Sequence, residues 1–209
     1  GGLPAFPGSL TKSGIGNWTL GGTLSHAGVT SVSSGKFFVN ANATAATGNI
    51  AVSSGATLGG TGTLGGNTTI AASGILEFNL STAAGSHDKL DLASGKSLTF
   101  SGASVLNITT SGGASTGDYT LVTAPGGIGG SAPATVNLPA GWSATVSIVG
   151  NELVLQVTST GAATITLANL SATYNGSPMA ATATTNPPGL TVAFAYDGSS
   201  TPPTNAGSY

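Results

Sequence analysis

The chain has 209 residues, enough for one large domain or two small ones, and only 5% of them are charged, against about 25% in an average soluble domain. Four Lys, no Arg and a formal net charge of −2 exclude the basic surface that binds nucleic acid. An apolar content of 39% is too high for a disordered chain, and no apolar run approaches the ~20 residues of a membrane-spanning helix.

The chain contains no Cys, which excludes a disulfide framework and a thiolate metal site. Its first residues, Gly1-Gly2-Leu3-Pro4, include neither an initiator Met nor the apolar segment of a signal peptide. We therefore expect the sequence to be a piece of a longer polypeptide.

An internal repeat of about twenty residues runs through the first half of the chain. The dipeptide Ser-Gly recurs with this period at 13/14, 34/35, 54/55, 73/74 and 94/95. Apolar residues flank it at matching places in residues 32–38 (Val-Ser-Ser-Gly-Lys-Phe-Phe), 52–58 (Val-Ser-Ser-Gly-Ala-Thr-Leu) and 92–98 (Leu-Ala-Ser-Gly-Lys-Ser-Leu). Around Gly74 the copy is shifted by one residue, with Ile70 and Leu76 in the apolar places. The flanks indicate a structural repeat, since Ser-Gly alone is common in so glycine-rich a chain.

Each repeat predicts short β-strands separated by tight turns. Stretches such as Leu76–Leu80 alternate apolar and polar residues, as half-buried strands do, and Gly-Gly pairs between them mark turns. Such a unit is one coil of a β-solenoid, whose coils stack ~4.8 Å apart. We predict an all-β fold with a parallel β-solenoid over residues 1–99, in which residues 34, 54, 73 and 94 form one column.

Two segments resemble the autotransporter-associated β-strand repeat. They are residues 10–20 (Leu-Thr-Lys-Ser-Gly-Ile-Gly-Asn-Trp-Thr-Leu) and residues 48–66 (Gly-Asn-Ile-Ala-Val-Ser-Ser-Gly-Ala-Thr-Leu-Gly-Gly-Thr-Gly-Thr-Leu-Gly-Gly). The resemblance spans roughly residues 8–80. It implies a right-handed parallel β-helix from the passenger region of a large secreted or surface protein of a bacterium.

Longer strands replace the short period over residues 100–158, which we interpret as an antiparallel β cap on the solenoid. Residues 143–149 and 152–158 predict a hairpin that turns at Gly150-Asn151. A terminal unit of this kind covers the open edge of the last coil. The stretch from His87 to Trp142 also resembles the segment that closes such repeats in secreted bacterial proteins.

Residues 159–162 form a short linker by composition, and a different pattern follows it over residues 163–209. Its motifs resemble the MBG module, a mostly-β, glycine-rich, immunoglobulin-like domain; they are Tyr174-Asn175-Gly176, Asn186-Pro187-Pro188-Gly189-Leu190, Tyr196-Asp197-Gly198 and Asn205-Ala206-Gly207-Ser208-Tyr209. Residues 190–196 alternate as a sandwich strand should. The resemblance implies an incomplete Ig-like β-sandwich, so we expect further domains of the same polypeptide or strands from another chain.

The residues carry little sign of a catalytic, cofactor-binding or metal site, and we predict none of the three. The densest polar group is His87, Asp88, Lys89 and Asp91, which we interpret as a solvated turn between coils. Glu77 and Glu152 are expected at the surface. A polysaccharide lyase or hydrolase on a β-helix is the enzymatic alternative. Such sites use clustered carboxylates with Lys or Arg, and this chain has no Arg and no carboxylate cluster.

Other candidate ligands find equally little support. His26 and His87 are far apart in sequence, and residues 126–130 lack the Asp of a calcium-binding solenoid repeat. No phosphate-binding loop is present. Trp18 and Trp142 could stack on sugars, although the interpretation we favour places each at an end of the core.

These observations predict a structural segment, a spacer, stalk or fibre, of a large exported bacterial protein outside the cell or at its surface. The alternative is an adhesin module that binds glycan or assembles with itself by strand exchange through the incomplete Ig-like module. An aromatic or Asn-rich patch on one face would favour adhesion. We expect no enzyme activity, no cofactor, no nucleic-acid partner and no membrane span in this segment.

Overall fold

A computed structural model describes residues 8–80, 87–161, 164–171, 173, 175–186 and 190–208. Within these ranges the chain is all-β with no helix, as predicted. It divides into two compact units, one ending at Gly161 and the other beginning at Ala162. The described part contains no helix that is long and apolar enough to cross a membrane.

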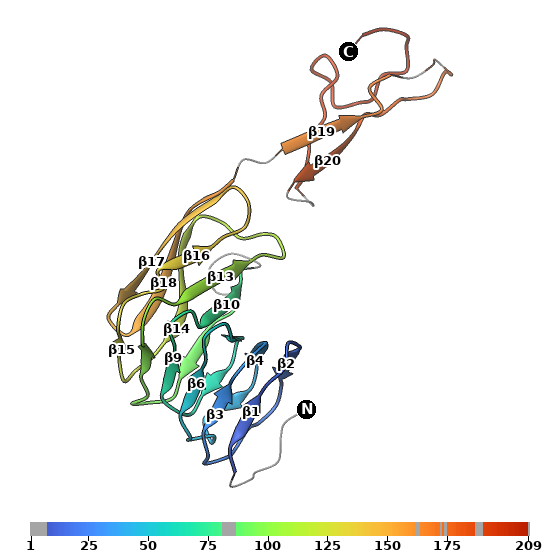
Figure 1. The fold of residues 1–209 in the computed structure, drawn as a ribbon. Coiled ribbons are helices and arrows are strands. Elements are labelled where there is room, and N and C mark those ends of the chain that lie inside the picture. Colours follow the sequence, from blue (N-terminus) through green and yellow to red (C-terminus); the bar gives the residue numbers. More distant parts are fainter. Residues whose placement is uncertain are drawn as a thin grey trace. The chain divides into compact units, whose positions relative to one another are not determined.

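Three sheets of six strands each make up the first unit (Figure 1). The first sheet is parallel throughout and contains β1 (Leu10–Lys12), β3 (Thr30–Val32), β6 (Ile50–Val52), β9 (Thr68–Ile70), β12 (Leu98–Phe100) and β15 (Ile128–Gly129). The second is also parallel and contains β2 (Asn17–Leu20), β4 (Lys36–Val39), β7 (Thr57–Gly59), β10 (Ile75–Asn79), β13 (Val105–Thr109) and β16 (Thr135–Asn137).

The third sheet combines parallel and antiparallel pairing. Its parallel part contains β5 (Asn42–Ala43), β8 (Thr63–Leu64), β11 (Leu90–Leu92) and β14 (Gly117–Thr123). Two antiparallel strands follow β14, namely β18 (Glu152–Thr160) and then β17 (Trp142–Val149) at the edge. The chain thus visits the sheets in turn and adds one strand to each per coil, which is the predicted solenoid.

The coils have two different lengths. In the first sheet the partner of Leu10 is Thr30, that of Thr30 is Ile50, and that of Ile50 is Thr68, so the first three coils are close to the predicted period. The partner of Thr68 is Leu98 and that of Leu98 is Ile128, so the next two coils are half as long again. The period seen in the sequence describes only the first three coils.

Two members of the predicted column of residues 34, 54, 73 and 94 are wrong. Val32, Val52 and Ile70 are register partners, so the turns after them stack at the corner between the first and second sheets. There Ser73 takes a positive φ of 59°, in the place where Gly55 has 73°. Gly95 has the same turn conformation, with φ of 70°, but it follows β11 and lies at a different corner. The motif specifies a turn type and not a corner.

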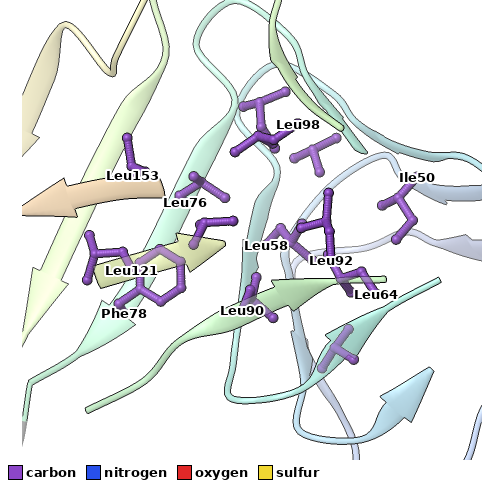
Figure 2. Packing of buried hydrophobic residues seen from close by; sticks show 14 of the residues in the cluster. Ile50, Leu58, Leu64, Leu76, Phe78, Leu90, Leu92, Leu98, Leu121 and Leu153 are labelled. Atoms are coloured by element: carbon purple, nitrogen blue, oxygen red, sulfur yellow. The ribbon is translucent and has the colours of Figure 1, made fainter. Parts of the chain in front are cut away.

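Alternation along each strand places one row of side chains inside the solenoid. Phe37, Leu58, Leu76 and Leu106 are register partners across the second sheet and are all buried. Figure 2 shows how aliphatic residues of different sheets meet in the interior, with Leu58, Leu64 and Leu92 close together. Fully burying one such side chain contributes ~1.5–3 kcal/mol.

The antiparallel part of the first unit is shorter than predicted. Parallel pairing continues through β15 and β16 to Asn137, so the boundary at residue 99 is early with respect to the pairing. The predicted hairpin is present as β17 and β18, with Val146 opposite Leu155 and Ile148 opposite Leu153. Leu153 and Leu155 are fully buried, so the hairpin packs against the end of the core.

The second unit has one two-stranded antiparallel sheet in its described part, formed by β19 (Thr164–Ala168) and β20 (Thr182–Asn186). The strand predicted at residues 190–196 is not formed, although Val192, Phe194 and Tyr196 are half-buried and their neighbours exposed. The backbone of Tyr196 forms an isolated bridge to Ser199, and its hydroxyl accepts a hydrogen bond from the N–H of Ala181 at 2.9 Å. The alternation is present, but among the described residues no strand pairs with this segment. The motif residues Tyr174 and Pro187–Gly189 lie outside the described ranges.

Candidate binding groove on the second sheet

A row of five residues crosses the outer face of the second sheet. Phe38, Gly59, Glu77, Asn107 and Asn137 are successive register partners. They alternate with the buried row that includes Leu58 and Leu76, so they face away from the core. We call these five residues the outer row.

Lys36 and Glu77 form an ion pair within this face. Lys36 Nζ lies 2.7 Å from each carboxylate oxygen of Glu77, and the Glu77 side chain is only 11% exposed against 39% for Lys36. The expectation that Glu77 is a surface residue is therefore wrong. Its position faces outward as predicted, but neighbouring side chains cover it.

Gly59 is tightly enclosed in the outer row. It lies between Phe38 and Glu77, and a Cβ at Gly59 would collide with the carbonyl oxygen of Glu77 and would lie 3.0 Å from the ring of Phe38. The Phe38 ring therefore occupies the space above Gly59. Lys36 on β4 reaches Glu77 on β10 across the intervening strand β7.

A chain of hydrogen bonds continues from Glu77 along the outer row. Asn107 Nδ2 donates to Glu77 Oε2 at 3.4 Å, and Asn137 Nδ2 donates to Asn107 Oδ1 at 2.7 Å. Each residue lies on a successive coil, 30 residues from the one before. Asn107 is thus held from both sides, while Asn137 on β16 is exposed.

A groove of about 500 Å³ opens beside these residues. Polar side chains of three coils line it together with two half-buried apolar residues that follow β16. The lining includes Glu77, Asn107, Thr109, Asn137, Leu138 and Pro139. The arrangement offers hydrogen-bond donors and acceptors beside a short apolar wall, without a free charge.

The polar group at residues 87–91 is more structural than predicted. Asp88 accepts a hydrogen bond from the backbone N–H of Asn79 at 3.0 Å, and its own N–H donates to the carbonyl of Asn79 at 2.9 Å. His87 Nε2 lies 2.9 Å from the carbonyl oxygen of Thr120, and its ring meets that of Tyr119 edge-on. These residues are half-buried and not a solvated turn. These contacts attach residues 87 and 88 to strands β10 and β14.

Lys89 and Asp91 pair with each other at 2.9 Å. No group of three His, Cys, Asp or Glu side chains that could hold a metal ion occurs in the described part of the chain. His26 is buried and its Nε2 lies 2.8 Å from Thr30 Oγ1. Burial lowers the pKa of His26 from its ordinary value.

The two tryptophans and Glu152 lie near the ends of the ladders. Trp18, on the edge strand β2, is the register partner of buried Phe37 and is 47% exposed. Trp142, on the edge strand β17, is half-buried against the core. Glu152 is half-buried and accepts a hydrogen bond from Thr120 Oγ1 at 3.3 Å. None of the three lines the groove.

The groove was missed in the sequence because its polar residues are spaced more widely than the visible repeat. Only the longer coil aligns Glu77, Asn107 and Asn137. That spacing was itself the available signal. With it, the cluster of Glu77, Asn107 and Asn137 on one face would have been recognisable.

Comparisons with known proteins give two results. Residues 163–209 match the model of the MBG domain family, which confirms the resemblance derived from their motifs, so the chain contains an MBG module there. Over 69 residues the chain is 42% identical to the adhesin BmaC autotransporter of Brucella suis biovar 1. That match covers 33% of this chain and 2% of that adhesin. The resemblance of residues 8–80 to the autotransporter-associated repeat stays a prediction.

Proposed function

We propose that this chain is a spacer segment of an exported, adhesin-like bacterial surface protein. The observation that carries the proposal is the unbroken parallel pairing of the first and second sheets over six strands each. Backbone hydrogen bonds between coils fix the length of such a body at ~4.8 Å per coil. Length is then set by the number of coils and not by particular side chains.

Composition and comparisons support the same role. Only 5% of the residues are charged, and the interior is one continuous hydrophobic cluster. The MBG module after the solenoid, and the identity with a bacterial autotransporter adhesin, support export to a bacterial surface. In this proposal the solenoid holds the modules that follow it away from the cell.

The spacer proposal predicts that added coils add a fixed length. Because the chain has no Cys, spin labels can be placed by Thr11→Cys on β1 and Thr99→Cys on β12, both outward and exposed. These positions are four strand steps apart in the first sheet, or ~19 Å. Val32 and Val52 are register partners, so duplicating residues 33–52 inserts one whole coil.

One duplication is expected to lengthen the label distance measured by pulsed EPR by ~4.8 Å, and two by about twice that. The distance distributions should stay as narrow as in the unextended chain. An unchanged distance, or a broad distribution in both extended variants, would contradict a stacked spacer. Folding is checked independently by the circular dichroism and unfolding transition of each variant.

A second proposal concerns self-association through the MBG module. All five residues of β19 are exposed, including Ile165 at 55% and Leu167 at 48%. An exposed strand with apolar side chains and an open edge is a template for pairing with another chain. We infer that a second copy of this chain adds a strand there.

Analytical ultracentrifugation of the full chain tests this second proposal. Concentration-dependent association is expected, and Ile165→Lys with Leu167→Lys should abolish it. The matched control changes Thr164 and Thr166 on the same strand to Lys and should weaken association less. A chain that stays monomeric at all concentrations, or a control that acts as strongly as the test variant, would overturn the proposal.

A further inference from the structure

We propose that the groove beside the outer row binds a neutral saccharide. This site would be additional to the spacer role and does not depend on it. The inference rests on three properties of the groove, namely the chemistry of its polar groups, its lack of net charge and its apolar wall.

The polar lining matches vicinal hydroxyl groups. A carboxamide presents an N–H donor and a carbonyl acceptor side by side. Asn107 and Asn137 bring such groups to one groove from two successive coils. The Thr109 hydroxyl at the groove accepts from Asn79 Nδ2 and donates to the Phe78 carbonyl, so it supplies no free donor. The ~4.8 Å step between coils is close to the length of one sugar ring in an extended glycan. Each coil therefore offers one planar amide per ring.

The electrostatics select an uncharged ligand. Both oxygens of the Glu77 carboxylate lie 2.7 Å from Lys36 Nζ, so the nearest negative charge is already neutralised. A metal cation would have to displace that ammonium group, and an anionic ligand would find no cation among the lining residues. A neutral hydroxylated ligand needs neither to displace the ammonium group nor to find a countercharge.

The remaining wall suits the apolar face of a pyranose ring. Leu138 and Pro139 are half-buried and line the groove directly after β16. The Asn107 side chain is already fixed by its bonds to Glu77 and Asn137. A side chain ordered before binding loses little conformational entropy when a ligand arrives. The groove is thus preorganised along its polar side.

Titration of the ¹⁵N-labelled full chain with neutral hexasaccharides tests the site. Cellohexaose, chitohexaose and mannohexaose serve as probes, with hexagalacturonate as the anionic comparison. At least one neutral probe is expected to shift the side-chain amide signals of Asn107 and Asn137. Asn137→Ala should raise the dissociation constant about tenfold, since it removes polar contacts to the ligand. Asn107→Ala should act in the same direction.

The matched control is Asn67→Ala. Asn67 also bridges coils 30 residues apart, since its Oδ1 accepts from the N–H of Ser97 at 3.0 Å, but it does not line the groove. This variant should bind as the unchanged chain does. The proposal is overturned if no neutral probe binds at millimolar concentration, if hexagalacturonate binds as well as the neutral probes, or if Asn137→Ala and Asn67→Ala behave alike. Unfolding curves establish that each variant is folded.

Discussion

Gly48 stacks directly on Gly28 of the preceding coil, and a Cβ on Gly48 would collide with the carbonyl oxygen of Gly28. The same relation holds between Gly66 and Gly48 and between Gly28 and Gly8. This glycine column follows the three short coils found in the first sheet. It lets the backbones of successive coils approach each other at the corner before the first sheet.

Gly48→Ala is therefore expected to lower the free energy of unfolding by roughly 1–3 kcal/mol, because the added methyl group forces adjacent backbones apart. Gly21→Ala is the matched control, since a Cβ there meets no atom within 4 Å. The control should be neutral, or stabilising by up to about 1 kcal/mol through the unfolded state. Urea denaturation measures both. If both variants lose the same free energy of unfolding, the close approach of the backbones at Gly48 is not the cause of the loss.

The ion pair between Lys36 and Glu77 predicts an asymmetric response to mutation. Lys36→Met leaves a nearly buried carboxylate without its counter-ion and should cost ~1–3 kcal/mol. Glu77→Gln leaves a half-exposed ammonium group that water can solvate, so its cost should stay below ~1 kcal/mol.

The double variant Lys36→Met/Glu77→Gln provides the control for this asymmetry. It should recover most of the loss caused by Lys36→Met, because no buried charge remains. Chemical denaturation of the unchanged chain, the two single variants and the double variant at one pH completes this double-mutant cycle. If Glu77→Gln costs as much as Lys36→Met, the carboxylate is solvated and the burial argument fails.

The solenoid itself could be predicted because it depends on local alternation. Strands such as Leu76–Leu80 show period two in the sequence, and turns such as the one at Gly55 need a positive φ that the sequence marks with Gly. The hairpin at Gly150-Asn151 was likewise visible from two residues and their flanks. Features of this kind are decided within a few residues.

The groove and the burial of Glu77 depend on residues far apart in the sequence. The Glu77 carboxylate is held by Lys36, which reaches it from β4 across the intervening strand β7. Asn107 and Asn137 meet only because the last coils are longer than the first three. Since a coil can lengthen in a loop without changing any strand, its length is not encoded in the strand pattern. Gly95 was misplaced for the same reason.

Lys12 stands at an inward position, as the register partner of buried Val32, and is only 1% exposed. Its ammonium group donates to the carbonyls of Ser13, Gly14 and Ser34 at 2.8–3.0 Å. Ser13 and Gly14 are exposed, so water can replace the ammonium group there. Lys12→Met, which keeps the volume of the side chain, should therefore cost less than about 1.5 kcal/mol.

Lys12→Ala should cost more, ~2–4 kcal/mol, because it opens a cavity beside Trp18, whose ring centroid lies 5.9 Å from Lys12 Nζ. Unfolding followed by Trp18 fluorescence in a Trp142→Phe background compares the two variants. Equal losses for Met and Ala would show that the charge, and not the packing, holds this end of the ladder.

Buried His26 makes stability dependent on pH. Burial lowers the pKa of His26 below the ordinary value of 6.5, so the unfolded chain binds the proton more tightly than the folded one. Its contribution is fully present above the unfolded pKa and is lost as pH falls through the folded pKa. Below pH ~6.5 the free energy of unfolding should fall by up to ~1.4 kcal/mol per pH unit.

His26→Gln removes the titrating group and should flatten this fall between pH ~6.5 and ~5, above the range in which carboxylates titrate. His87→Gln leaves His26 in place and is the comparison variant. Urea denaturation at several pH values measures all three proteins. If the slope persists in His26→Gln, the pH dependence belongs to other groups. A group contributes to this slope only if its pKa differs between the folded and the unfolded chain.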